Sequence, residues 1–234
     1  MDDKPDRHEQ HAEDGQCMST STTPPTSTTT DSPPQGPDSE VKIHKACLNG
    51  DLTRVKFIVS QGQEDINTRD SIMSTPLMKA ACGGNRDLFD FLVTEGADIS
   101  LVDNHGCSVL HWACRGNSIE MVKHILCLDG MDVNSRGTDG LTPLSCAAWR
   151  GNVDMFKFLV SVGADVTVVD DIGQNILHTA CEGGNVDMVK YILSKNIVDV
   201  NARTRLGETA ADIAHQWKHP EVVRLLKRSR CHVM

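Results

Sequence analysis

The sequence has no long apolar run, since nowhere do eighteen or more apolar residues follow one another. A helix needs about 20 apolar residues to cross a bilayer, so no membrane insertion is expected. The N-terminus MDDKPDRHEQ is acidic and polar with no apolar stretch behind it, and no Asn-x-Ser/Thr sequon occurs. Secretory signals and glycosylation acceptors are therefore both missing. These absences predict an intracellular protein, in the cytoplasm with the nucleus as an alternative.

A concentration of positive charge is also missing. The net charge is −9, and residues 1–40 hold nine acidic residues against two basic ones, a net −7. The remainder then carries 21 basic and 23 acidic residues, or −2, which argues against direct nucleic-acid binding. One small basic cluster, at residues 224–230, fits either cations placed at a helix C-terminus or a nuclear-import signal.

Catalytic signatures are absent too. The sequence contains no phosphate-binding G-x-x-x-x-G-K-[ST], no H-E-x-x-H, no G-x-S-x-G and no dinucleotide fingerprint. We therefore expect no enzyme and no cofactor. The nine cysteines are odd in number and scattered, so we expect reduced, small core residues rather than a disulfide framework.

The first forty residues differ in composition from the rest. Residues 18–37 consist mainly of Ser, Thr and Pro and have almost no apolar side chains. Such a segment buries too little surface to offset its ordering entropy, which predicts a disordered tail over 1–40. Ser32, followed by Pro33, fits a site for a proline-directed kinase, and a plain solvated spacer is the alternative interpretation.

From residue 41 the sequence repeats with a period of 33 or 34 residues. The repeat is set by one apolar anchor in each unit, namely Ile43, Leu77, Leu110, Leu144, Leu177 and Ala211. Two positions before the last five anchors stand helix N-cap residues, namely Thr75, Ser108, Thr142, Asn175 and Thr209. Seven positions after the first five anchors comes Gly or Asn, which suits a left-handed helix end.

A second helix follows in each unit, with apolar residues at the spacing of a buried stripe, as in Phe89, Leu92 and Val93. Each unit is therefore turn, helix, turn, helix, and none can bury its apolar face alone. The expected fold class is all-α, a helix-turn-helix solenoid of about six repeats that follows a disordered N-terminal tail.

At this point the sequence resembles the ankyrin repeat family, whose motif is matched by GLTPLSCAAWRGN and by VDVNART. The resemblance spans about 41–228. It implies a capping repeat at 41–70, four central repeats over 71–204, and a capping repeat with a short tail at 205–234. The first unit lacks the usual turn, and the last has Ala210 and Asp212 at the Pro and His positions of the motif, as expected of capping units.

Three units carry a His and a Cys three residues apart, which raises the question of a metal. The pairs are His44 with Cys47, His111 with Cys114, and His178 with Cys181. Successive pairs lie two repeats apart, on the order of 20 Å, and so cannot share one ion. A structural zinc takes four ligands, and each pair offers two. We expect no metal, and the resemblance implies that each His bonds backbone between adjacent turns.

The resemblance implies a protein-interaction module whose stacked units form a concave groove. An adaptor or scaffold for one or more partner proteins is the leading hypothesis, with a monomer as the expected state. A stoichiometric inhibitor of a transcription factor or kinase is one alternative. A regulatory piece of a larger enzyme or channel is another, although the capped ends and the Met1 start argue against it.

Residues that the repeat itself does not need are the candidates for partner contact. Trp149 and Arg150 are expected on the exposed side of a first helix, where the family places variable binding positions, and exposed Trp and Arg are frequent hot spots. Partial cover of Trp149 by the next unit is the competing interpretation, and Trp112 is expected in the core. The other candidates are Arg115 and Glu182 on neighbouring first helices and His105, Leu141 and Ile172 at turn tips.

Two asparagines are candidates for modification. Asn134 and Asn201 each follow Asp-Val and have Leu eight residues earlier. In the ankyrin family this arrangement resembles the sites of the asparaginyl hydroxylase that also acts on hypoxia-inducible factor. The alternative is a purely structural Asn that fixes the turn by hydrogen bonds. Asn67 has Val59 in place of the Leu and is expected to be modified less.

Overall fold

The computed structural model describes residues 39–62, 64–128 and 130–230. Within these ranges the chain forms twelve α-helices, one short 3-10 turn (η2, Thr138–Gly140) and no strand. The predicted all-α class is confirmed. Most of the predicted tail, including Ser32, lies outside the described residues.

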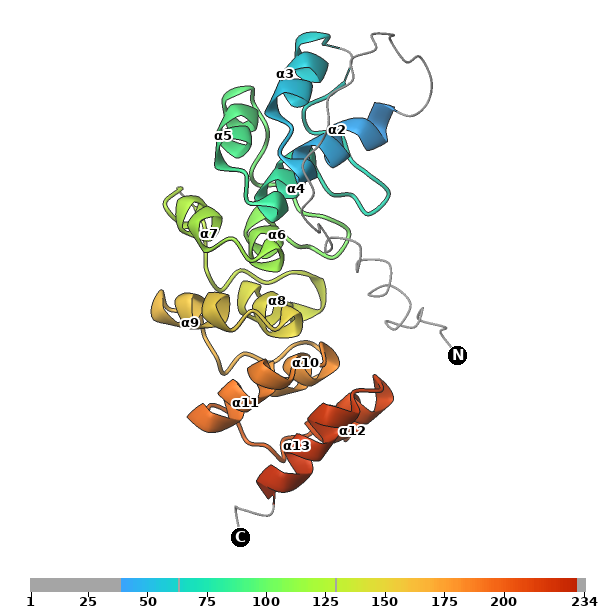
Figure 1. The fold of residues 1–234 in the computed structure, drawn as a ribbon, viewed down its shortest axis with the longest axis vertical. Coiled ribbons are helices and arrows are strands. Elements are labelled where there is room, and N and C mark those ends of the chain that lie inside the picture. The colour runs from blue at the N-terminus through green and yellow to red at the C-terminus, as the bar shows by residue number, and fades with distance from the viewer. Residues whose placement is uncertain (1–38, 63, 129, 231–234) are drawn as a thin grey trace, which may run out of the picture. The chain divides into compact units, whose positions relative to one another are not determined.

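The helices alternate between two rows, as the repeat predicts (Figure 1). The first-helix row consists of α2 (Ser39–Asn49), α4 (Pro76–Gly83), α6 (Val109–Gly116), α8 (Pro143–Arg150), α10 (Ile176–Glu182) and α12 (Ala210–Gln216). The second-helix row consists of α3 (Leu52–Ser60), α5 (Arg86–Thr94), α7 (Ile119–Leu126), α9 (Val153–Ser161), α11 (Val186–Lys195) and α13 (Pro220–Arg230). Each first helix packs on its own second helix and on the first helix of the next repeat.

The start and end of each first helix follow from the residues that the sequence places there. All five predicted N-cap residues precede their helices, and the Thr142 hydroxyl, for example, accepts a hydrogen bond from Ser145 N at 3.2 Å. Gly84, Asn117 and Gly151 take the left-handed conformation at the other end, with φ of 71°, 61° and 75°. The short first helices are thus set by local chemistry at both ends.

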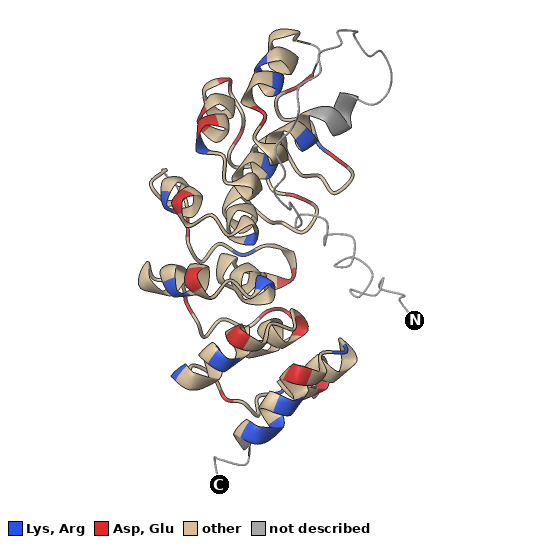
Figure 2. Ribbon diagram, in the orientation of Figure 1, with Lys and Arg blue, Asp and Glu red and all other residues tan. Residues whose placement is uncertain are grey.

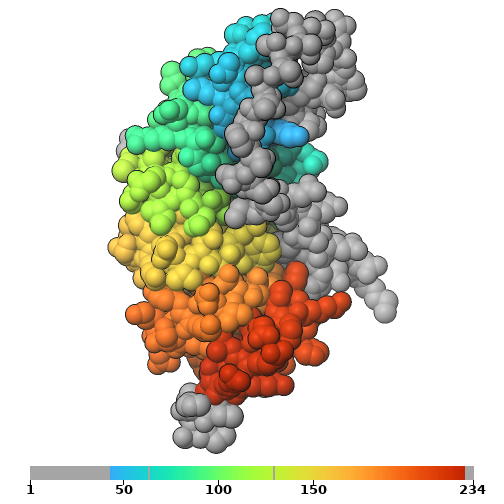
Figure 3. All heavy atoms as spheres, viewed as in Figure 1, coloured from blue at the N-terminus to red at the C-terminus, as the bar shows by residue number. Residues whose placement is uncertain are grey.

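The core runs continuously between the two rows. Phe89 and Phe156, from the predicted second-helix stripes, are fully buried. First helices approach one another closely because their facing positions are small. A Cβ added to Gly116 would lie 1.9 Å from the Cys82 carbonyl oxygen, and one added to Gly183 would lie 1.8 Å from that of Trp149. The repeats therefore stack as successive layers, visible as bands of colour in Figure 3.

The three repeat histidines bond backbone of the following turn, as the resemblance implied. His44 Nε2 donates to Ser74 O at 3.0 Å, and His111 and His178 reach Leu141 O and Ala202 O, each at 3.2 Å. Nδ1 of His111 accepts a hydrogen bond from Ser108 N at 3.2 Å, which leaves Nε2 as the donor. Burial lowers the pKa of His111 to about 4, and burial also lowers the pKa of His178.

This arrangement predicts loss of stability in mild acid. Because the pKa of His111 falls from 6.5 to about 4 on folding, the unfolded chain takes up a proton at higher pH than the folded chain does. The stabilisation that neutral His111 contributes is complete above the unfolded-state pKa of 6.5. It is lost as the pH falls toward the folded-state pKa of about 4. We expect His111 alone to remove about 2 kcal/mol from the free energy of unfolding between about pH 7 and about pH 5.

The measurement is urea unfolding at both pH values for wild type and His111→Gln, whose amide does not titrate. The variant should be less stable at neutral pH by about 1–3 kcal/mol. Its free energy of unfolding should nevertheless decline less between the two pH values. Equal declines in the two proteins would show that His111 is not the group responsible.

Candidate functional site

The candidate site is one side of the first-helix row, on which half of the side chains are buried and half are exposed or partly exposed. Residues two and five positions after each anchor share one side of a helix, because three residues make nearly one turn. We call this surface the first-helix face. Its members are Lys45, Lys79, Trp112, Cys146, Thr179 and Ile213, with Leu48, Cys82, Arg115, Trp149, Glu182 and Gln216.

Trp112 is the centre of a cluster of charges on this face. It is buried, as expected, and its Nε1 donates to Asp103 Oδ2 at 2.9 Å. The Lys79 ammonium lies 4.4 Å from the centroid of the indole ring, and the Arg115 guanidinium carbon lies 5.1 Å from it. The indole thus positions two cations, one from α4 and one from α6.

Carboxylates beneath the face hold these groups in place. Asp70 pairs with Lys79 at 3.1 Å and accepts hydrogen bonds from Ser74 N and Oγ at 2.9 and 2.6 Å. Burial acts against the charged form of Asp70, but the Ser74 bonds and the Lys79 ammonium outweigh it and lower the pKa of this carboxyl. Asp103 also accepts from His105 N and Cys107 N, at 2.9 and 2.8 Å. Both carboxylates are engaged within the repeats.

Trp149 and Arg150 lie at the C-terminal end of α8 and are partly buried, so the predicted exposure is only partial. The Arg150 guanidinium carbon lies 5.3 Å from the centroid of the Trp149 ring. Arg150 Nε is buried and makes no hydrogen bond to any described residue. Arg150 also stands where repeats two, three and five have Gly83, Gly116 and Gly183. This donor has therefore lost water without gaining a protein partner.

Cys146, on α8, is buried and lies close to Cys107 of the turn before α6. The interaction between the two thiols raises the pKa of Cys107 and lowers that of Cys146. The guanidinium groups of Arg115 and Arg150 add to the lowering of the Cys146 pKa. Asp103 acts in the opposite direction on Cys146, so charges of both signs lie near the centre of the face.

The three predicted turn-tip residues, His105, Leu141 and Ile172, are also partly buried. Their carbonyl oxygens link successive turns: His105 O accepts from Thr138 N at 2.7 Å, and Ile172 O accepts from Arg205 N at 2.8 Å. Leu141 O accepts the His111 bond described above. These bonds hold the tips in a fixed row, which positions their side chains along one edge of the first-helix face.

Glu182 departs from the prediction of an accessible contact residue. It is 8% exposed, and its carbonyl oxygen accepts from His219 Nε2 at 3.0 Å. Close stacking of the last two repeats covers this position. Glu182 is therefore less available to a partner than Arg115, which occupies the equivalent position on α6.

Residue-by-residue reasoning missed Lys79, Asp103 and the Cys107–Cys146 contact. A signal for Lys79 was present, since it occupies the same repeat position as Trp112 one unit earlier. Side chains at equivalent positions of adjacent repeats are neighbours in a solenoid. Asp103 and Cys107 lie in the turn before α6, where the repeat alone does not predict side-chain direction.

A search of the described residues finds no group of three or more His, Cys, Asp or Glu side chains placed to hold a metal ion. The same part of the chain has no helix with the length and apolar content needed to span a bilayer. Six of the seven cysteines there are buried, and Cys127 is exposed.

These features define a helical repeat protein. It has capped helix pairs, backbone hydrogen bonds between successive turns, and a first-helix face whose side chains vary from repeat to repeat. The family model for ankyrin repeats matches in three overlapping copies, over residues 43–137, 77–170 and 144–234. The chain belongs to the ankyrin repeat family, and ankyrin repeats are protein-binding modules.

The curated relatives of this chain are proteins of different kinds. A putative palmitoyltransferase of Danio rerio, ZDHHC13, is 31% identical over 194 residues, which cover 81% of this chain and 30% of the relative. The B-cell lymphoma 3 protein homolog of Mus musculus is 29% identical over 199 residues, covering 82% of this chain and 44% of the relative. The chain thus spans less than half the length of these relatives.

A solved structure confirms the fold alone. A chain in the complex of the predatory endopeptidase Bd0816 from Bdellovibrio bacteriovorus with immunity protein Bd3460 superimposes with a TM-score of 0.59. The two chains are 24% identical, and the match covers 80% of this chain and 96% of the other.

The structure gives the candidate modification site Asn134 a structural role. Its Oδ1 accepts from Asp165 N at 2.8 Å, and its Nδ2 donates to Gly163 O at 3.1 Å, so its amide joins two successive repeats. The comparison residue Asn67 accepts from Asp98 N at 2.8 Å in the same way. A modifying enzyme must open this turn before it reaches the amide of Asn134.

We predict that Asn134→Ala lowers the free energy of unfolding by about 1–2 kcal/mol, because it removes both bonds. We also predict that co-expression with the asparaginyl hydroxylase adds the mass of one oxygen atom to Asn134 and Asn201. Peptide mass spectrometry measures this gain. No gain at either residue would reject the modification, and equal gain at Asn67 would reject the role of the leucine.

Proposed function

We propose that this chain is an intracellular, monomeric adaptor or scaffold that binds a partner protein through the first-helix face, with Trp149 and Arg150 at the centre. The observation that carries the proposal is the buried Nε of Arg150, which makes no hydrogen bond within the described residues and lies beside the partly exposed Trp149. A partner carbonyl or carboxylate placed there would satisfy this donor.

Physical chemistry supports this assignment over a purely structural role. A buried donor without a partner costs about 1–3 kcal/mol, and an acceptor supplied by a ligand is one way in which that cost is removed. Trp and Arg together are also the side chains most often found at binding hot spots. Glycine at the position of Arg150, as in three other repeats, would avoid the cost entirely.

The neighbouring residues supply the rest of the surface. Arg115 adds a second guanidinium group on α6, and His105, Leu141 and Ile172 form the edge along the turn tips. Rim contacts of this kind contribute specificity and exclude water more than they add affinity. The partner's identity follows from none of these contacts, and the chain needs no chemistry of its own for this function.

A second candidate function has support from the palmitoyltransferase relatives. The chain aligns with 30% of the Danio rerio protein, which is consistent with a binding segment that acts within a larger enzyme assembly. In that case the first-helix face would present substrate or regulator to a catalytic part elsewhere. Palmitate transfer measured with and without this chain, added to a candidate enzyme, would distinguish this function from a free-standing adaptor.

We predict that Trp149→Ala/Arg150→Ala abolishes partner capture while leaving helicity and thermal midpoint nearly unchanged. The measurements are affinity purification with quantitative mass spectrometry, circular dichroism and thermal unfolding. Asp154→Ala/Lys157→Ala is the matched control, since it removes an exposed ion pair from α9 in the same repeat. This control should retain every partner.

Two results would contradict the proposal. If the Trp149/Arg150 variant kept its partners, the binding site would lie elsewhere on the chain. If it lost several degrees of thermal midpoint together with the partners, Trp149 would be a packing residue whose loss disturbs α8. A partner whose own activity is suppressed in the complex would make the chain a stoichiometric inhibitor rather than a scaffold.

A further inference from the structure

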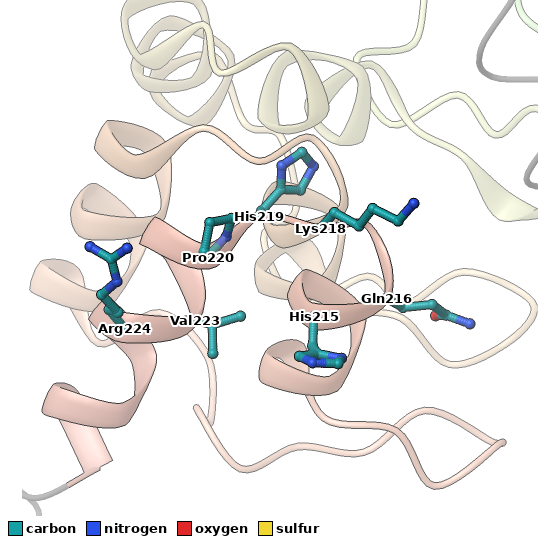
Figure 4. Close-up of a pocket in the computed structure, with 7 residues that line it drawn as sticks. All are labelled: His215, Gln216, Lys218, His219, Pro220, Val223 and Arg224. Carbon is teal, nitrogen blue, oxygen red and sulfur yellow. The ribbon is translucent and has the colours of Figure 1, made fainter.

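The last repeat contains an open groove between α12 and α13, remote in sequence from the residues of the proposed partner site (Figure 4). Its volume is about 700 Å³. Pro220 and Val223 lie in the middle of the view, between Arg224 on one side and Lys218 and His215 on the other. An apolar floor is thus flanked by nitrogen-bearing side chains.

The groove has charge of one sign. The ionisable side chains that line it are Lys218, Arg224 and two imidazoles, and no acidic residue is among the described residues of its lining. Lys227 and Arg228 are exposed farther along α13. Figure 2 shows blue bands along this helix. Glu221 pairs with Arg224 at 2.9 Å, but both side chains are about two-thirds exposed, so this pair is weak and exchangeable.

The residues around this groove depart from the repeat in two ways. The fourth position after the anchor is Ala or Cys in the first five repeats, with no exposed surface, and is the exposed His215 in the last. The seventh position is Gly or Asn in the first five repeats and Lys218 in the last.

Lys218 adopts the left-handed conformation with φ of 60°, which disfavours a lysine compared with glycine. Its backbone N–H donates to His215 O at 3.1 Å, as a glycine there would. The capping geometry therefore does not need this side chain. Glycine at this position would remove the backbone strain. The retained lysine is therefore an argument that its ammonium group contacts a ligand.

We propose that this C-terminal groove binds an acidic segment of a partner protein, with Lys218 and Arg224 contacting carboxylates and Val223 and Pro220 contacting an adjacent apolar side chain. The one-sign lining and the apolar floor fit alternating acidic and apolar residues. Nucleic acid is the other polyanion that such a lining attracts, and an oligonucleotide of the same charge is therefore one arm of the test. The groove shares Gln216 with the first-helix face but contains none of the residues proposed above to contact the first partner, so one chain would present two binding sites.

The test uses the full chain and a fluorescein-labelled peptide of repeated Glu-Glu-Leu triplets, followed by fluorescence anisotropy at low ionic strength. We expect saturable binding that Lys218→Gly/Arg224→Gln weakens about tenfold, because two ion pairs are lost. Lys157→Gln/Lys190→Gln is the matched control, since it removes two paired, exposed lysines from α9 and α11. This control should bind as wild type does.

Lys218→Gly separates binding from structure. Glycine relieves the left-handed strain, so we expect the thermal midpoint to rise by about 2–4 °C while peptide affinity falls. Asn196→Gly, at another left-handed helix end with φ of 49°, should not lower the midpoint and should leave affinity unchanged. A merely structural Lys218 would show the rise in midpoint without the loss of affinity.

Three outcomes would overturn the proposal. One is no binding of the peptide at low ionic strength, where electrostatic attraction extends about 30 Å. Another is equal weakening by the control pair of substitutions, which would indicate attraction to any surface lysine. The third is equal affinity for an oligonucleotide of the same charge. Retained binding by Trp149→Ala/Arg150→Ala would show that the groove acts independently of the first-helix face.

Discussion

The structure depends on close contact between the first helices of successive repeats. A helix pair of about 33 residues cannot bury its apolar face alone, so each repeat is stable only when its neighbours cover it. Alanine and cysteine side chains at the facing positions, and glycine against a carbonyl oxygen at Gly116 and Gly183, allow the approach. The regular row of turn tips follows from this stacking distance.

Hydrogen bonds from histidine and asparagine side chains make the otherwise apolar contact between repeats directional. The bonds from His111 and His178 to the next turn, and from Asn134 to the turn beyond Gly163, join specific atoms in adjacent repeats. Apolar packing alone tolerates small slips between layers, whereas a buried bond with a neutral imidazole does not. These polar residues thus fix the register in which the first-helix face is displayed.

Most of the fold could be predicted from the sequence because each local signal for a helix start, a helix end or a buried stripe recurs in several repeats. Caps such as Thr142, left-handed ends such as Gly151 and stripes such as Phe156 occur at the same positions in unit after unit. The site was less predictable because it consists of departures from the repeat. Arg150 was visible as such a departure, whereas the burial of Glu182 depends on how tightly two layers meet, which no local pattern specifies.

The two binding surfaces proposed above both contain departures from the repeat. Repeats pack about 10 Å apart, so the fourth and sixth units lie on the order of 20 Å from each other. Arg150 in the fourth and Lys218 in the sixth each replace a glycine or asparagine that the stack would favour, at separate positions and on separate helix ends. Partners held at this separation experience a high effective concentration of one another, which is the physical basis of an adaptor.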